Sequence, residues 1–222
     1  MITLDEIRNN TKLQEYKRMV IETNEVLNLT AITDLFEFDV KHLYDSLLIS
    51  DYFDYKFKNI MDLGSGAGFP GIPLAILLKD TNFYLVEPTK KRCDFLTRVK
   101  DALNLTNVTI INKRSEDLDI NFRDYFDFIV TRAVSRLNIL LEISLPFLKT
   151  NGYLICYKGI KYQEEINDSS IALKILNSTI EEVKKETLPF LNEERFNIII
   201  KKNKEIDKKY PRLYSIIKKR PL

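Results

Sequence analysis

The sequence predicts an α/β fold: a mostly parallel sheet with an N-terminal helical extension and a C-terminal antiparallel hairpin. From residue 59 onward, short β-branched runs alternate with segments of helical periodicity, which is typical of parallel strands joined by crossover helices. Before that point the chain has helical patterns. Two alternating runs joined by "LNEE" close the fold and indicate an antiparallel pair.

The length and composition favour a single domain. With 222 residues and 45% hydrophobic content, the chain can bury a full core. We predict one domain over 1–222, made of a helical extension (1–55), a core that binds a cofactor (56–203) and a basic C-terminal tail (204–222).

The extension contains two helical patterns. In residues 4–29 apolar side chains recur near helical spacing, and Thr3 followed by Glu6 is the signature of a capping box. The segment "NLT", which begins at Asn28, is expected to end this helix. A second helix is predicted over residues 38–50.

The predicted strands follow the change of pattern at residue 59. Three segments between them are long enough for crossover helices, and a further helical segment follows Gly159. The hairpin is predicted over 178–190 and 195–203. This order is the plan of a Rossmann-like fold, with parallel strands that begin near residues 59, 83, 108, 126 and 152.

The stretch "NIMDLGSGAGFPGIP" (59–73) holds four of the six glycines of the chain. Gly64, Gly66 and Gly68 directly follow the first strand with the spacing G-x-G-x-G. A residue without Cβ permits positive φ and lets backbone N–H groups approach a ligand, and this position is where α/β sheets bind one. A tight turn without a ligand is the alternative.

Two further elements favour a nucleoside-like ligand. Glu87 closes the second strand 21 residues after Gly66, near the interval at which an acid meets ribose hydroxyls. Ser115 and Glu116, in "RSEDL", follow the third strand where an adenine ring would lie, although an N-cap turn is an equal reading. No G-K-[ST] follows the glycine loop, which argues against a triphosphate site.

The net charge of +2 is unevenly distributed. Residues 201–222 carry +7, so the other 200 residues sum to −5. With Tyr210 and Tyr214 interleaved, this tail is suited to phosphate contacts and to stacking on single-stranded or looped RNA. A solvated lysine-rich tail is the alternative. We expect removal of residues 204–222 to weaken RNA binding and to leave cofactor affinity intact.

The cysteines, the single histidine and the hydropathy of the chain bear on metal binding and on membrane association. Cys93, Cys156 and the single histidine, His42, do not form a metal-ligand set. The chain has no apolar run near eighteen residues, and its N-terminus lacks the features of a signal peptide. We therefore predict a cytoplasmic monomer that binds neither metal nor membrane.

Several motifs occur in the order found in one family. They include "NLTAIT", "KHLYDSLL", "DLGSGAGFPGIPLAI", "KKRCDFL", "TRAVSRLNILLE", "YKG", "ERFNIIIKK" and "KKYPR…KKRPL". In these motifs the chain resembles the RsmG family, also called glucose-inhibited division protein B, the guanine-N7 methyltransferases of small-subunit ribosomal RNA. The resemblance implies a Rossmann-like class I methyltransferase fold, S-adenosylmethionine as cofactor, and the 530-loop region of 16S rRNA, naked or in the small subunit, as substrate.

The resemblance also implies roles for individual residues. Phe69 would line the methionine end of the cofactor, and Arg132 would reach the cofactor or the RNA. The sequence departs from many relatives at Glu87-Pro88-Thr89, where they have an aspartate-serine pair, and after "YPR", where it lacks a glycine. The predicted catalytic residues are Arg132, His42 and Asn28; the cofactor-binding residues are Asp62, Gly64, Gly66, Gly68, Phe69, Glu87, Ser115, Glu116 and Arg132; and the RNA-binding residues are Lys158, Arg195, Lys208, Lys209, Arg212, Lys218, Lys219 and Arg220.

The implied chemistry suits a chain without an evident catalytic triad. Guanine N7 has an in-plane lone pair and no proton, so methylation there needs alignment and electrostatics but no general base. Methylation of cytosine C5 would need a nucleophilic thiol, and Cys156 lies among alternating apolar residues. Adenine-N6 enzymes would show N/D-P-P-Y/F where this chain has "TRAV". A small-molecule methyltransferase of the same fold and a non-catalytic NAD-binding module are the alternatives.

Overall fold

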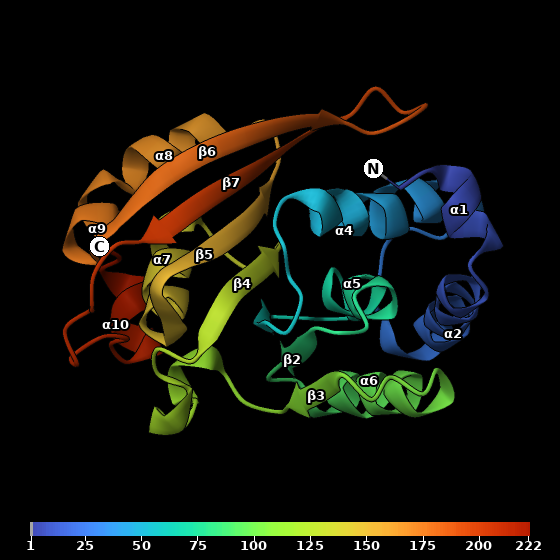
Figure 1. Ribbon diagram of the computed structural model, residues 1–222, viewed down its shortest axis with the longest axis horizontal. Coiled ribbons are helices and arrows are strands. Elements are labelled where there is room, and N and C mark those ends of the chain that lie inside the picture. The colour runs from blue at the N-terminus through green and yellow to red at the C-terminus, as the bar shows by residue number, and fades with distance from the viewer. Residues whose placement is uncertain (1) are drawn as a thin grey trace.

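The computed structural model describes residues 2–222, which contain a seven-stranded sheet of order β3-β2-β1-β4-β5-β7-β6. Strands β1 to β5 pair in parallel, whereas β7 runs antiparallel to both β5 and β6. The predicted fold class and terminal hairpin are therefore confirmed (Figure 1). The strands are β1 (Asn59–Leu63), β2 (Asn82–Val86), β3 (Val108–Ile111), β4 (Phe126–Arg132), β5 (Leu148–Lys158), β6 (Ser178–Thr187) and β7 (Glu194–Lys202).

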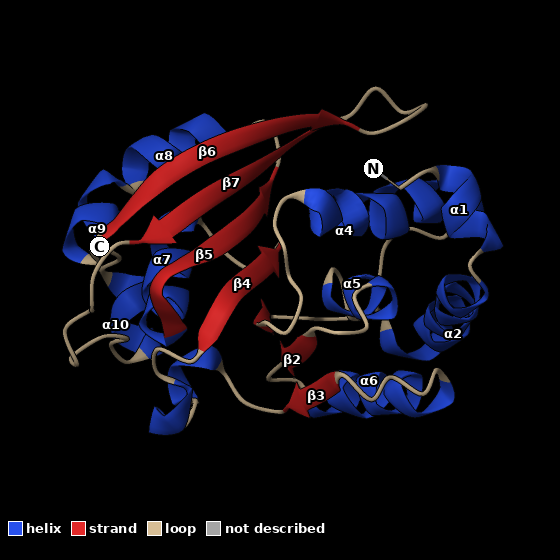
Figure 2. Cartoon of the chain, viewed as in Figure 1, coloured by secondary structure: helices blue, strands red, loops and turns tan. Residues whose placement is uncertain are grey.

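The three predicted crossover helices are α5, α6 and α7, and two 3-10 turns connect β3 to β4, where no helix was predicted. Each face of the sheet carries its own helical layer: α2, α4, α5 and α6 lie on one side and α7 to α10 on the other (Figure 2). No helix within residues 2–222 has both the length and the apolar character needed to cross a membrane. The helices are α1 (Leu4–Asn9), α2 (Thr11–Leu27), α3 (Leu35–Phe38), η1 (Asp39–Tyr44, a π-helix), α4 (Asp45–Leu47), η2 (Leu48–Asp51), α5 (Gly71–Leu77), α6 (Lys90–Ala102), η3 (Ser115–Asp117), η4 (Ile120–Phe122), α7 (Leu137–Ser144), η5 (Leu145–Phe147), α8 (Tyr162–Asp168), α9 (Ser170–Ile175) and α10 (Tyr214–Lys219).

The two layers give the protein two hydrophobic cores. Successive side chains of a strand point to opposite faces, so Ile60 packs with the N-terminal helices while its neighbour Met61 packs with the α7 layer. The central strands are apolar because both of their faces are covered. The edge strand β6 instead alternates half-buried and charged positions, which discourages pairing with another chain.

The N-terminal extension differs from the prediction in one respect. The capping box at Thr3 and Glu6 is present, and the helix ends at Asn28 in the left-handed conformation with φ 47°. The single helix predicted over residues 4–29 is wrong, however, because the side chain of Asn10 accepts from Lys12 N and Leu13 N at 3.1 Å and begins a second helix. The next helical stretch is continuous from α3 to η2 and includes the π-helical turn η1.

The C-terminal tail is packed onto the protein rather than solvated along its whole length. Ile206, Tyr210 and Ile217 are buried in the second core, and α10 lies against α7. Arg123 donates from Nη1 to the carbonyl of Tyr210 at 2.8 Å and from Nη2 to that of Ile206 at 2.5 Å. The tail is therefore a structural part of the domain that also carries a basic surface.

Candidate functional site

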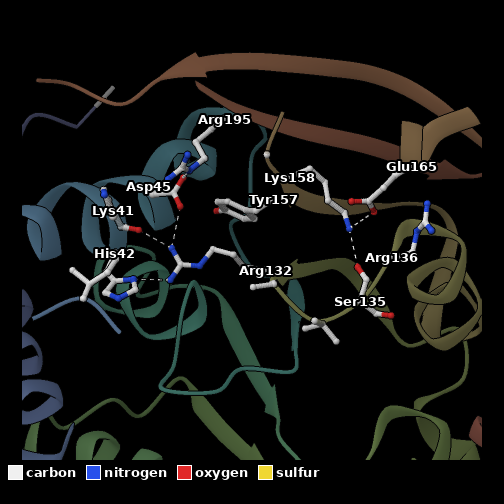
Figure 3. A pocket seen from close by; sticks show the side chains of 14 residues that line it. Lys41, His42, Asp45, Arg132, Ser135, Arg136, Tyr157, Lys158, Glu165 and Arg195 are labelled. Atoms are coloured by element: carbon white, nitrogen blue, oxygen red, sulfur yellow. Dashed lines mark hydrogen bonds and ion pairs between the residues drawn. The ribbon is translucent and has the colours of Figure 1, made fainter. Parts of the chain in front are cut away.

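Two adjoining cavities lie at the carboxyl ends of the parallel strands, where α/β sheets bind their ligands. The larger, of about 640 Å³, is walled by η1, the ends of β4 and β5, the start of β7, and α8 (Figure 3). The smaller, of about 80 Å³, lies over the ends of β1 and β2. Val134 and Ser135, in the loop after β4, line both cavities. This loop is the partition between them.

The glycine loop has the backbone conformation that its sequence predicts. Gly64 and Gly68 have φ of 72° and 106°, values that other residues rarely adopt. An added Cβ on Gly64 would lie 2.5 Å from Val134 Cγ2, on the side of the small cavity, whereas one on Gly68 would lie 2.6 Å from Ile72 Cγ1. Gly64 is thus the glycine of the ligand-facing surface, and Gly68 is required by packing.

Glu87 fastens the loop to the second strand. Its Oε2 accepts from Gly66 N at 3.0 Å and its Oε1 accepts from Thr89 N at 2.8 Å, and the residue is only 2% exposed. Each carboxylate oxygen has a second lone pair, so a contact with ribose hydroxyls is compatible with these bonds.

Asp62 lies beneath the loop and is fully buried. Its Oδ2 accepts from Gly71 N at 3.0 Å, which fixes the start of α5, while its Oδ1 has no hydrogen-bond partner. Burial raises the pKa of Asp62 to about 7, more than the bond from Gly71 lowers it. The residue supports the loop from below and lines neither cavity.

Ser115 and Glu116 meet Gly64 in the small cavity, as predicted for residues that frame one ligand. Ser115 Oγ donates to Glu116 Oε2 at 3.3 Å, whereas Glu116 Oε1 is buried without a hydrogen-bond partner. Arg114 Nη1 lies 3.8 Å from this oxygen. An unsatisfied buried acceptor beside a glycine cradle fits a ligand that brings a donor, such as the amino group of a nucleobase.

Arg132 and His42 form a hydrogen-bonded cluster in the wall of the large cavity (Figure 3). Arg132 donates to the carbonyl of Lys41 and to Asp45 Oδ2, both at 3.1 Å, and to His42 Nδ1 at 3.2 Å. Because arginine only donates, His42 Nδ1 accepts, and Nε2 carries the proton that faces Thr30 Oγ1 at 2.6 Å. Burial and the nearby guanidinium lower the pKa of His42 to about 3, so the ring is neutral at pH 7.

Phe69 joins this cluster from the glycine loop. Its ring stacks on His42 with centroids 4.4 Å apart and planes 11° apart, and the guanidinium of Arg132 lies 5.0 Å from its centroid. Three predicted site residues from three distant segments are therefore in one stack. The π-helical turn that carries His42 is an uncommon conformation, found frequently at functional sites.

The carboxylates of the large cavity are both paired. Asp45 contacts Arg132 and, at 3.6 Å, Arg195; its burial raises its pKa, while the two arginines lower it by a smaller amount. Glu165 accepts from Lys158 Nζ at 2.6 Å and from Leu137 N at 2.8 Å.

The predicted RNA-binding residues fall into two groups. The first group forms ion pairs inside the fold. Lys158 pairs with Glu165 in the cavity wall, and Arg195 contacts Glu193 at 3.0 Å. The side chain of Arg212 donates to Glu142. The second group is exposed in the tail and consists of Lys208, Lys209, Lys218, Lys219 and Arg220; Lys204, which was not predicted to bind RNA, is exposed as well. Lys209 lies 3.3 Å from Asp207.

Asn28, which the sequence predicted to be catalytic, lines neither cavity and has a structural position at the end of a helix. Asn28 ends α2, two residues before the threonine that faces His42. Reasoning from sequence did not single out Asp45, Val134 or a site role for Tyr214. Asp45 had a signal, because it follows His42 by three residues in a helical pattern and so shares its face. Within residues 2–222 no group of three His, Cys, Asp or Glu could hold a metal ion.

Comparisons with known proteins identify the family of this chain. The family model "GidB: rRNA small subunit methyltransferase G" matches residues 9–199. A protein named ribosomal RNA small subunit methyltransferase G from Thermoanaerobacter sp. (strain X514) is 43% identical over 94% of this chain and 88% of its own length. One of the same name from Fusobacterium nucleatum is 42% identical over 100% of this chain and 94% of its own length.

Solved structures with low sequence identity share the fold. A SAM-dependent methyltransferase from Aquifex aeolicus superposes with a TM-score of 0.59 at 15% identity, covering 76% of this chain and 94% of its own. TYW2 from P. horikoshii, solved in complex with MeSAdo, has a TM-score of 0.59 at 12% identity and covers 72% of this chain and 62% of its own. These similarities support the assigned architecture.

Proposed function

We propose that this chain, which belongs to the rRNA small subunit methyltransferase G family, transfers a methyl group from S-adenosylmethionine to N7 of a guanine in the 530-loop region of 16S rRNA. Methyl transfer to RNA requires a cofactor site and a base site that meet at the reacting atoms. The two cavities adjoin across Val134 and Ser135, and we infer that one receives the cofactor and the other the base.

The residues around the small cavity fit a nucleoside cofactor. Gly64 removes a side chain that would otherwise fill the cradle, Glu116 Oε1 offers an unsatisfied acceptor, and Glu87 lies below the loop. When bound, S-adenosylmethionine supplies an electrophilic methyl group. The cavity of about 80 Å³ is smaller than the roughly 300–1,000 Å³ usual for such sites. Val134, 39% exposed and next to Ala133 with φ 56°, is the side chain that must move to enlarge it.

The single observation that favours a ring nitrogen without a proton as the methyl acceptor is the protonation and pairing of the groups in the large cavity. Among such nitrogens, the family's motifs favour guanine N7. His42 is neutral and accepts from Arg132, and the carboxylates Asp45 and Glu165 are held in ion pairs. These groups are poorly placed to remove a proton from a substrate. Guanine N7 has no proton to lose, so alignment of its lone pair with the methyl carbon is sufficient.

The Arg132 cluster then has a positioning role. Its guanidinium is fixed by three acceptors and by the Phe69 ring, so little reorganisation is needed when an anionic group binds. The methionine carboxylate or an RNA phosphate are the anions available in this reaction.

The exposed cations of the tail extend the site toward RNA. Lys208, Lys209, Lys218, Lys219 and Arg220 are exposed at the surface, and each cation that neutralises a phosphate releases a counterion. We infer that these residues supply salt-dependent affinity, while the large cavity receives the base.

Methyl mapping tests the proposal directly. The purified protein is incubated with tritiated S-adenosylmethionine and small ribosomal subunits, or naked 16S rRNA, from cells that lack the gene. We expect one label per 16S rRNA, and reduction followed by aniline cleavage should locate N7-methylguanine in the 530-loop region. Label on another atom would overturn the N7 assignment. In a parallel incubation with a small-molecule extract of the same cells, label in the extract and none in RNA would favour a small-molecule methyltransferase.

A further inference from the structure

We propose that the C-terminal segment completes the cofactor site, and that the ring of Tyr214 forms the wall against which the cofactor's nucleobase stacks. The inference rests on the proposed cofactor, S-adenosylmethionine, and adds a ligand contact from outside the Rossmann-like core. It begins from the walls of the small cavity. Tyr214, the first residue of α10, lines that cavity together with Ser115 and Glu116, which frame the proposed base site.

The position of Tyr214 suits a stacking contact. The ring is half-buried, and the guanidinium of Arg114 lies 4.9 Å from its centroid. Arg114 also lines the cavity and lies next to Ser115 in the chain. An aromatic ring and a guanidinium are both planar surfaces on which nucleobases stack. The apolar side chains of Leu63, Val86 and Ile143 also line the cavity, so it offers both flat and apolar contact.

The hydrogen-bonding groups of the small cavity suit the nucleobase of the cofactor better than its methionine part. Glu116 Oε1, the buried oxygen without a hydrogen-bond partner, is in the same cavity as Tyr214. An adenine held between these two residues would donate its amino group to this oxygen, which lies 3.8 Å from Arg114 Nη1, while the face of the base contacts the ring. The stacked cluster of Phe69, His42 and Arg132 is instead associated with the larger cavity.

Tyr214 is held in place by a buried ion pair two residues before it. Arg212 donates from Nε to Glu142 Oε1 at 2.7 Å and from Nη2 to Glu142 Oε2 at 2.5 Å, and its backbone N donates to Oε1 at 3.0 Å. Glu142 is fully buried in α7. On the next turn, Ile217 is buried against the same layer. The segment is thus anchored on both sides of the tyrosine, which preorganises the wall.

Calorimetric titration with S-adenosylhomocysteine and with 5′-methylthioadenosine tests the role of Tyr214. Loss of one base-stacking contact weakens binding by roughly 5- to 150-fold. We expect Tyr214→Ala to weaken both ligands by the same factor in this range, because both contain the base, and Tyr214→Phe to bind as the wild type does. Leu213→Ala, which changes an exposed residue of the same segment, is the matched control.

The outcomes separate this inference from the proposed function. If the wild type binds neither ligand, the cofactor assignment itself fails. If the wild type binds and Tyr214→Ala binds equally well, the stacking wall is wrong while the cofactor assignment stands. If Tyr214→Ala melts at a markedly lower temperature than the wild type without ligand, the titrations are repeated with Tyr214→Leu, which keeps apolar volume but has no aromatic ring. Equal affinities of Tyr214→Leu and Tyr214→Phe for the ligands would overturn the inference.

Discussion

Arg132 shows how a single residue links the site to the extension of the fold. It lies at the end of β4, and its acceptors, the Lys41 carbonyl, His42 Nδ1 and Asp45 Oδ2, all come from one helical stretch of the N-terminal extension. The extension therefore supplies one wall of the large cavity and the counter-charge for its arginine. The same contacts mean that Arg132 has a structural role in addition to any role in the reaction.

Replacement of Arg132 by alanine should reduce both stability and activity. It leaves the buried Asp45 with only the more distant Arg195, and breaking a buried pair costs about 3–5 kcal/mol. Arg132→Lys should restore the charge but not activity, since an ammonium cannot reproduce the planar fork. Urea unfolding and tritium transfer, assayed at a temperature where each variant is folded, measure the two effects. Adding Asp45→Asn to Arg132→Ala should recover stability without activity; recovery of both would show that the arginine acts only through folding.

Asp62 should make stability depend on pH in a direction opposite to that of most carboxylates. Its pKa is raised from 3.8 to about 7, so the folded state binds its proton more tightly than the unfolded state does. The stabilising contribution is complete below pH 3.8 and is lost as the pH rises through 7. Asp62→Asn keeps an acceptor for Gly71 N and does not ionise. We expect its stability relative to the wild type to increase between pH 4 and 7.5, by on the order of 4 kcal/mol.

Thermal denaturation across this pH range compares Asp62→Asn with a matched control. Asp101→Asn changes an aspartate that is exposed on the surface near the end of α6. Its melting temperature should follow that of the wild type at every pH. A difference between Asp62→Asn and the wild type that does not change with pH would contradict the buried-acid account.

At the scale of elements, local signals predicted most of the fold. The β-branched runs predicted all five parallel strands, and the signal is strongest in the central strands β1 and β4, which lie between covered faces and need apolar side chains on both sides. The break between α1 and α2 was missed because the apolar spacing continues across it. Asn10 is the C-cap residue of one helix, and its side chain caps the start of the next. The spacing of apolar residues does not show such a break.

The cap at Asn10 makes this break testable. Asn10→Ala removes the acceptor for Lys12 N and Leu13 N, and loss of such a cap costs about 1 kcal/mol. Asn10→Asp should retain the stability, because aspartate caps equally well. Asn9→Ala, at an exposed neighbouring position, is the control and should change stability by less than about 0.5 kcal/mol. Equal urea midpoints for Asn10→Ala and Asn9→Ala would show that the cap does not stabilise the extension.

At the scale of the whole molecule, the site depends on contacts that join distant segments. The glycine loop and the acid after β2 were predictable because they lie in one β-α-β unit, β1-α5-β2, with a typical spacing. The pairing of Asp45 with Arg132 joins positions 87 residues apart, and that of Arg212 with Glu142 joins positions 70 apart. No local pattern encodes either pair. For the tail, the sequence predicted a charged surface. Its few apolar residues are buried by contacts with the α7 layer, and those contacts cannot be inferred from the tail's own sequence.

Packing of the tail changes what its removal should do. Deleting residues 206–222 exposes the core beneath Ile206, Tyr210 and Ile217 and leaves Glu142 buried without its arginine. The truncated protein should therefore melt at a lower temperature and bind S-adenosylhomocysteine more weakly, because it also loses Tyr214. This differs from the expectation that a basic tail contributes only RNA affinity.

Charge removal should instead separate RNA binding from folding. A variant with glutamine at the exposed positions 208, 209, 218 and 219 keeps the buried contacts of the tail and loses four charges. We expect unchanged cofactor affinity and weaker RNA binding. The slope of log affinity against log salt concentration should decrease in magnitude by up to about 3 for single-stranded RNA. Filter binding at several salt concentrations measures the slope. If the slope is unchanged while cofactor affinity falls, the exposed lysines act on the fold of the tail, and RNA must be held by other cations.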